Sequence, residues 1–266
     1  MLRNRIITAL ILAPLALMAI FLLPTFWFAV LFAAVAGLAC YEWAGLCGLS
    51  RVPLKCLYVG VFGVAAASLY TNPELHGGIL LSACVLWGLA VVAVLLYPRL
   101  ASLFRQPLLV GLIGLWMALA AWLALLSLRN LEDGSIWLLW MFILVWGADI
   151  GAYFAGRAFG KTALAPAVSP GKTWAGAVGG FLLAGVLCGG AVLWWQEQPL
   201  FWLAVTFLLI IVSVFGDLFE SLLKRATGVK DSGHILPGHG GMLDRIDSLL
   251  AVAPVFAAIQ VYGVFS

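Results

Sequence analysis

The chain has 266 residues, of which 65% are hydrophobic and only 9% are charged. A water-soluble domain of this composition would expose large apolar patches, so the composition excludes an ordinary soluble protein and indicates a polytopic membrane protein. The sequence has no series of short strands with alternating polarity, which argues against an outer-membrane barrel. The net charge of +3 is modest, and we expect no nucleic-acid partner.

Apolar runs separated by charges, proline and glycine predict nine transmembrane helices. A helix needs about 20 apolar residues to cross the hydrocarbon, where it satisfies its own backbone hydrogen bonds. The predicted spans are residues 6–23, 26–46, 56–71, 78–97, 107–128, 135–156, 174–195, 200–222 and 243–264. We therefore expect an all-α fold in one integral membrane domain, residues 1–266. Residues 1–135 supply N-terminal helices, and residues 136–266 carry the polar loops and the expected site.

The basic residues lie almost entirely on one side of this predicted arrangement. When alternate connections are assigned to one side, 13 of the 14 Lys and Arg residues fall together, and only Arg129 falls on the other side. Cytoplasmic loops of membrane proteins carry such an excess of positive charge. The bias therefore predicts a cytoplasmic N-terminus and, for nine spans, a C-terminus on the opposite side.

Glycines recur at GxxxG spacing in and around the sixth and seventh predicted spans. The pairs are Gly147/Gly151, Gly156/Gly160, Gly176/Gly180 and Gly185/Gly189. Glycines four residues apart form a smooth strip on a helix and let another backbone approach closely. We therefore expect these two helices to pack tightly.

Polar residues around the connection between these two spans form a first candidate site. Asp149 lies within an apolar span, where a carboxylate is costly unless it is paired or faces a polar interior. The GKT triplet that follows is not a P-loop, because the first glycine of GxxxxGK[ST] would fall on Pro166 and no buried strand precedes it. We interpret Ser169, Lys172 and Thr173 as an anion-binding loop, with an ordinary basic loop as the alternative.

A second polar stretch, residues 217–248, holds nine of the 25 charged residues of the chain. Asp217, Ser221 and Lys224 follow one another at i, i+4 and i+7, with Glu220 at i+3, so they share one face of a helix. Asp217 lies well inside an apolar span. It is therefore predicted to bind a cation or to pair with a basic group.

The end of this stretch repeats the arrangement at the start of the last span. Asp244, Asp247 and Ser248 stand at i, i+3 and i+4. Acidic residues near a helix N-terminus can simply cap the helix, so capping alone could account for one of these aspartates. Capping explains less well why Arg245 lies between the two.

The connection KDSGHILPGHGGMLDR combines charges with glycines, which let backbone N–H groups approach anions. Carboxylates hold a hard cation through oxygen, and Lys and Arg neutralise phosphate oxygens. Two carboxylate sets around basic residues and a glycine-rich turn favour a magnesium–nucleotide site. The alternative is a salt-bridged cytoplasmic loop without a catalytic role.

Taken together, these residues resemble the signature of the phosphatidate cytidylyltransferases, also called CDP-diacylglycerol synthases. The resemblance rests on SxLKR from Ser221, KDxG from Lys230 and LPxHGGMxDRID from Leu236. The patch from Asp149 to Tyr153 and the SPxKTW sequence are similar to a second, weaker motif of the family. Many members carry an acidic or polar residue after that tryptophan, where this chain has Ala175. Any role of that side chain is therefore in doubt here.

The resemblance implies transfer of CMP from CTP to phosphatidic acid, giving CDP-diacylglycerol and pyrophosphate in phospholipid biosynthesis. The lipid phosphate would attack the α-phosphorus of CTP. It is already ionised, so catalysis would consist mainly of positioning and charge neutralisation. The resemblance also implies a Mg²⁺ cofactor, with K⁺ as an open alternative for a second metal. It places the chain among the lipids of a bacterial inner (cytoplasmic) membrane, and a homodimer stays open.

The resemblance and the residue patterns together assign roles to named side chains. Metal-linked carboxylates are expected at Asp217, Asp244 and Asp247, with Asp231 as a further participant. Phosphates would be held by Lys224, Arg225, Lys230 and Arg245. The nucleotide turn would be shaped by His239, Gly240 and Gly241. Contacts to CTP or to the lipid phosphate are expected from Ser169, Lys172, Thr173 and Ser221.

Three other classes of function fit parts of the pattern. A polytopic transporter usually places ionisable groups near the bilayer midplane, whereas here they gather at one edge. Another CTP-dependent lipid-phosphate enzyme, such as a lipid kinase, stays open. A CDP-alcohol phosphotransferase is disfavoured, because its DGxxAR and GxxxDxxxD motifs are missing from the sequence. A scaffolding protein would not need this set of carboxylates.

Overall fold

The structure, a computed structural model, describes residues 2–195, 198–229, 232–233 and 240–262, with side chains described from residue 12 onward except at residue 195. The described chain is mainly helical, as expected. Its helices are α1 (Leu2–Leu22), α2 (Thr25–Leu46), α3 (Val52–Thr71), α4 (His76–Leu95), α5 (Pro107–Arg129), α6 (Gly134–Phe159), α7 (Trp174–Ala184), α8 (Gly190–Trp195), α9 (Pro199–Ala226) and α10 (Leu243–Tyr262). Short turns of other helix types are η1 (Pro73–Leu75), η2 (Leu103–Arg105) and η3 (Gly185–Gly189).

Eight helical segments of the described chain are long and apolar enough to cross a membrane. They are Thr25–Leu46, Val52–Thr71, Pro73–Leu95, Pro107–Arg129, Gly134–Phe159, Trp174–Trp194, Pro199–Ala226 and Leu243–Tyr262. The first predicted span corresponds to α1, of which Leu12–Leu22 counts as a shorter apolar helix. The segment Trp174–Trp194 combines α7, η3 and most of α8, because a π-helical turn at Gly185–Gly189 joins the two α-helices. The predicted all-α, multi-pass membrane fold is confirmed.

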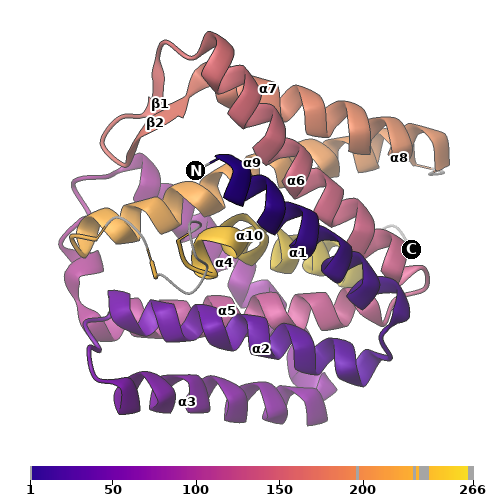
Figure 1. The fold of residues 1–266 in the computed structure, drawn as a ribbon. Helices are drawn as coiled ribbons and strands as arrows, with labels where there is room; N and C mark the ends of the chain where they lie inside the picture. The colour runs from indigo at the N-terminus through magenta and orange to yellow at the C-terminus, as the bar shows by residue number, and fades with distance from the viewer. Residues whose placement is uncertain (1, 196–197, 230–231, 234–239, 263–266) are drawn as a thin grey trace.

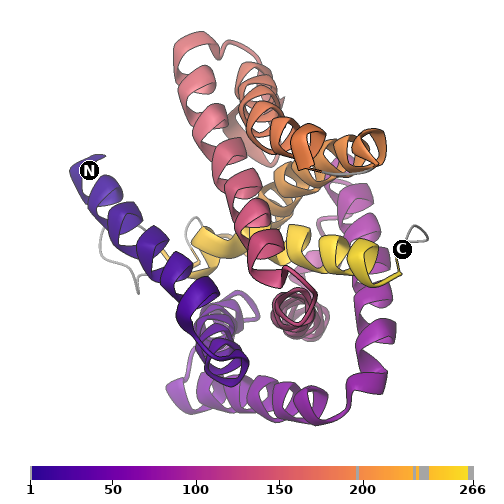
Figure 2. The ribbon, with the colours of Figure 1, turned by 90° about the vertical axis from the view of Figure 1, so that its right-hand side faces the viewer.

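Helix α10 runs through the middle of the molecule in both ribbon views (Figures 1 and 2). It packs against α9, α5 and α4, and also touches α6 and α2. Ala251, Val252 and Phe256 on this helix are fully buried. The first turns of α10 carry Asp244 and Asp247, so the packing of α10 fixes where these two carboxylates stand.

The tight packing predicted for the sixth and seventh spans is confirmed in the contact between α6 and α7, which lie side by side (Figure 1). A Cβ atom at Gly180 would stand 2.5 Å from the Ala148 carbonyl oxygen. A Cβ at Gly151 would overlap the carbonyl oxygen of Gly179. Only glycine allows this approach. The contact packs the part of α6 that carries Asp149 against Gly179 and Gly180 of α7.

The connection between α6 and α7 is a β-hairpin, where the sequence predicted a loop. Strand β1 (Ala163–Ala165) pairs antiparallel with β2 (Ser169–Thr173). Thr173 then caps α7, because its Oγ1 accepts the backbone N–H of Gly176 at 3.1 Å. Proline and glycine in the SPGKT segment are typical of turns, and strand pairing depends on a partner that local composition does not reveal.

Candidate active site

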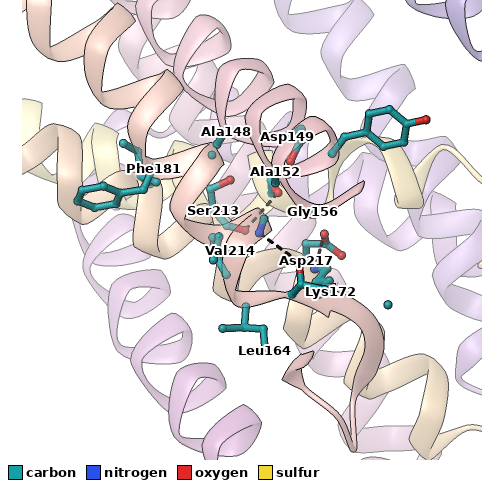
Figure 3. Close-up of a pocket in the computed structure, with 18 of the residues that line it drawn as sticks. Ala148, Asp149, Ala152, Gly156, Leu164, Lys172, Phe181, Ser213, Val214 and Asp217 are labelled. Atoms are coloured by element: carbon teal, nitrogen blue, oxygen red, sulfur yellow. Dashed lines mark hydrogen bonds and ion pairs between the residues drawn. The ribbon is translucent and has the colours of Figure 1, made fainter. Parts of the chain in front are cut away.

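A pocket of about 390 Å³ lies between α6, α7, α9 and the β-hairpin (Figure 3). Glycine and alanine residues of α6 and α7 line much of it. The polar side chains that line it are Asp149, Tyr153, Arg157, Lys172, Thr173, Ser213, Asp217 and Ser248. The two polar stretches identified separately in the sequence therefore meet in one pocket.

An ion pair joins these two stretches. Lys172 of β2 contacts the Asp217 carboxylate of α9, and Figure 3 shows both side chains in the pocket. The two side chains are 26% and 33% exposed, so the pair is partly accessible from the pocket. The prediction that Asp217 would be paired or cation-bound is consistent with this contact.

Three carboxylates converge beside this ion pair. Asp217 and Glu220 of α9 and Asp247 of α10 each place an oxygen within 4.8 Å of the other two. Glu220 is only 3% exposed, and its Oε1 has no hydrogen-bond partner among the described residues. Hard oxygen donors at this spacing fit a divalent cation such as Mg²⁺, and Oε1 of Glu220 is free to bind one while Oε2 pairs with Lys224.

Negative charge accumulates around Asp247. The charges of Asp149, Asp217 and Glu220 all act on it, and Lys172 is a nearby cation that opposes them. Like charges held together in a partly apolar setting repel one another, and a bound cation relieves that repulsion. The electrostatics of the site therefore favour the same ligand as its donor geometry.

Lys224 links the carboxylate cluster to the loop before α10. Its Nζ lies 2.5 Å from Oε2 of Glu220 and 2.7 Å from Oδ1 of Asp244. The other oxygen of Asp244 accepts the Gly241 N–H at 2.7 Å and the Ser232 hydroxyl at 2.9 Å. Asp244 is thus engaged by Lys224 and by the loop, next to the three converging carboxylates and not among them.

The sequence pattern that defines the cytidylyltransferase family matches residues 3–262. The chain belongs to this family. It is 45% identical over 262 residues to the phosphatidate cytidylyltransferase of Pseudomonas aeruginosa, covering 97% of each chain. It is 38% identical over 281 residues to that of Haemophilus influenzae, covering 97% of this chain and 98% of the relative. It is 39% identical over 273 residues to the phosphatidate cytidylyltransferase of Brucella suis, covering 98% of this chain and 93% of the relative.

Other residues predicted for the site have distinct surroundings. Arg225 donates through Nε to the Val168 carbonyl at 3.3 Å and so lies against the hairpin. Gly240 has a positive φ of 79°, which favours glycine, and a Cβ there would stand 2.7 Å from Oδ2 of Asp244. Ser169 lies in β2 and Ser221 in α9.

Three of the predicted site residues, Lys230, Asp231 and His239, lie outside the described residues. Arg245 stands in the first turn of α10, close enough to Asp149 for their charges to interact. The catalytic and binding roles assigned to all these residues stay predictions.

Two acidic residues at or near the candidate site were not assigned a role from the sequence. Glu220 was placed on the correct helix face but not among the cation ligands. Glu42 of α2 was missed: it is 3% exposed, and its Oε2 accepts the Leu243 N–H at 2.8 Å. The cost of placing a carboxylate in an apolar span could have singled out Glu42. Its partner could not be found this way, because it lies 201 residues away.

An apolar groove of about 540 Å³ adjoins the polar pocket. The two cavities share wall residues: Leu164, Ala177, Phe181, Ile210 and Val214. The groove continues along α4, the hairpin and α9 and is lined mainly by apolar side chains. A polar pocket beside such a groove suits an amphipathic molecule, with its charged end at Lys172 and its hydrocarbon along the groove.

Proposed function

We propose that the protein transfers CMP from CTP to phosphatidate, giving CDP-diacylglycerol and pyrophosphate. Family membership and the names of the full-length relatives support this function. The observation that carries the proposal is that Lys172 pairs with Asp217, one of three converging carboxylates, in a pocket that shares a wall with an apolar groove. The polar pocket suits a nucleotide with its cation, and the groove beside it suits the hydrocarbon of a lipid with a phosphate headgroup.

We infer that Asp217, Glu220 and Asp247 would hold Mg²⁺. A cation there would neutralise phosphate oxygens of the nucleotide. Asp244 was predicted from the sequence as a metal-linked carboxylate together with Asp217 and Asp247. Its contacts with Lys224 and the loop support a role in holding the site together. A second metal such as K⁺ and the assembly of the chain as a homodimer stay predictions.

The residues of the chain would act mainly by positioning and by balancing charge. An incoming phosphate can take the place of Asp217 as the partner of Lys172, because both are anions and the pair is partly accessible. The phosphate of phosphatidate is already ionised at neutral pH, so it needs no strong general base to attack the α-phosphorus of CTP. The pocket therefore has to bring two anionic groups together and neutralise the charge that develops between them.

Radiolabelled CTP distinguishes the proposed reaction from its alternatives. Purified protein in micelles containing phosphatidate should carry label from [α-³²P]CTP, but not from [γ-³²P]CTP, into chloroform-extractable lipid. A CTP-dependent lipid kinase would give the reverse pattern, because it transfers the γ-phosphate. No lipid labelling from either nucleotide, with Mg²⁺ supplied, would refute the proposal and favour a transporter.

We further propose that the protein lies in the bacterial inner membrane with its N-terminus and its pocket on the cytoplasmic side. The support is the 13-to-1 distribution of basic residues and the cytosolic location that CTP requires. A reporter enzyme that works only outside the cytoplasm should then be active when it is fused after Ser266, and a reporter that works only in the cytoplasm should be inactive there. Strong activity of a cytoplasm-specific reporter at that position would contradict the odd number of spans.

A further inference from the structure

Glu42 holds the start of α10 from a helix that is remote in sequence. Besides the Leu243 N–H at 2.8 Å, the Met242 N–H and the Ser232 hydroxyl lie within hydrogen-bonding reach of its carboxylate. Burying a carboxylate this deeply is costly unless hydrogen bonds compensate for the lost hydration. These contacts compensate in part, since Oε1 of Glu42 is buried without a hydrogen-bond partner among the described residues. Through Oε2, Glu42 and the loop before α10 stabilise one another.

Two carboxylates, Asp244 and Glu42, hold this loop. Asp244 accepts hydrogen bonds from Ser232 and Gly241, and Glu42 reaches Ser232 and the adjoining backbone at Leu243. A Cβ atom at either Gly233 or Gly241 would overlap the Glu42 carboxylate. Gly233 and Gly241 therefore make room for Glu42, in addition to any nucleotide they approach.

An ordinary helix cap does not account for this arrangement. Such a cap comes from the residue just before the helix, whereas Glu42 belongs to α2. The turn that it holds contains Asp244, which contacts Lys224, and the next turn of α10 carries Asp247. A shift at the start of α10 would therefore move both aspartates relative to α9.

We propose that Glu42 is a positioning residue of the active site. It holds the first turn of α10 so that Asp244 meets Lys224 and Asp247 meets the two carboxylates of α9. The cation-related part of this inference rests on the proposed function. Glu42 itself acts on the backbone of the loop and touches neither the cation nor the substrates.

The test compares Glu42→Ala and Glu42→Gln with a matched control, Trp122→Phe. Trp122 donates a buried hydrogen bond of 2.9 Å from α5 to the Ala29 carbonyl of α2, so the control also removes a buried hydrogen bond made by α2 but leaves the loop alone. Three quantities are measured on purified protein: the Mn²⁺ dissociation constant from electron paramagnetic resonance, hydrogen exchange of the peptide containing Leu243, and kcat and KM for CMP transfer.

We expect Glu42→Ala to weaken Mn²⁺ binding by about 10- to 100-fold, the usual effect of losing a residue that orients metal ligands. Exchange at Leu243 should accelerate, and kcat should fall more than the KM for CTP rises. The effects of Glu42→Gln on these quantities should be smaller than those of Glu42→Ala, because its amide oxygen still accepts the Leu243 N–H. Trp122→Phe should lower the melting temperature without changing Mn²⁺ affinity.

The proposal is overturned if Glu42→Ala lowers only the melting temperature, as the control does, and keeps wild-type Mn²⁺ affinity and kcat per folded molecule. If Glu42→Ala does not fold, Glu42→Gln decides: wild-type exchange and Mn²⁺ affinity in that variant would refute the positioning role. Mn²⁺ binding by the wild-type protein without CMP transfer would refute the proposed function instead, and the comparison of variants would still hold.

Discussion

Replacing Asp247 with asparagine should reduce CMP transfer by about 10³-fold, equivalent to about 4 kcal/mol of transition-state stabilisation. Asp247 comes from α10, whereas the other two converging carboxylates, Asp217 and Glu220, both come from α9. Asparagine keeps the shape of the side chain but removes its negative charge. The cation would lose one of three charged ligands. Because the other two come from α9, it would also lose its only charged ligand from α10 among the three.

The measurement is the initial rate of lipid labelling from [α-³²P]CTP per folded protein, together with Mn²⁺ affinity, which should fall in parallel. Asp133→Asn is a matched control, since it makes the same chemical change at an exposed residue. Asp133 has a left-handed φ of 55°, which asparagine adopts readily, so this control should fold and keep its activity. Near-normal turnover of Asp247→Asn with Mg²⁺ supplied would remove Asp247 from the cation site.

Asp244→Asn should also reduce CMP transfer, by about 10²- to 10³-fold, while membrane insertion stays intact. The loss has a different origin, because Asp244 holds Lys224 at 2.7 Å and the loop through Gly241 and Ser232. A neutral amide weakens the contact with Lys224 and leaves Lys224 more strongly bound to Glu220. The Lys224 ammonium, which is predicted to hold phosphate, and the loop before α10 would both be displaced.

A double-mutant cycle with Lys224→Met tests this origin. If Asp244 acts through Lys224, the two single substitutions should be strongly non-additive, and the double variant should be little worse than either one. Mn²⁺ affinity should fall less in Asp244→Asn than in Asp247→Asn. Equal losses of Mn²⁺ affinity in the two variants, with additive kinetics, would instead make Asp244 a direct ligand. The amount and melting temperature of each variant in the membrane fraction control for insertion and folding.

The membrane class, the approximate spans and the close contact of α6 with α7 were all predictable from the sequence. These features depend on local quantities: the length of an apolar run, the spacing of glycines, and the sign of the charges between spans. The polar stretches around Asp149 and after Asp217 were equally visible, because a charge in an apolar span needs a compensating partner.

Only the tertiary structure decided which partner each charged residue has. Lys172 meets Asp217, Glu220 joins Asp217 and Asp247, and Glu42 reaches Leu243 across 201 residues. Such contacts depend on how each helix is rotated and where it crosses its neighbours, and residue spacing along one helix fixes neither. The β-hairpin has a different reason: β1 and β2 are adjacent in the sequence, and their pairing overrides the turn-forming composition of the SPGKT segment.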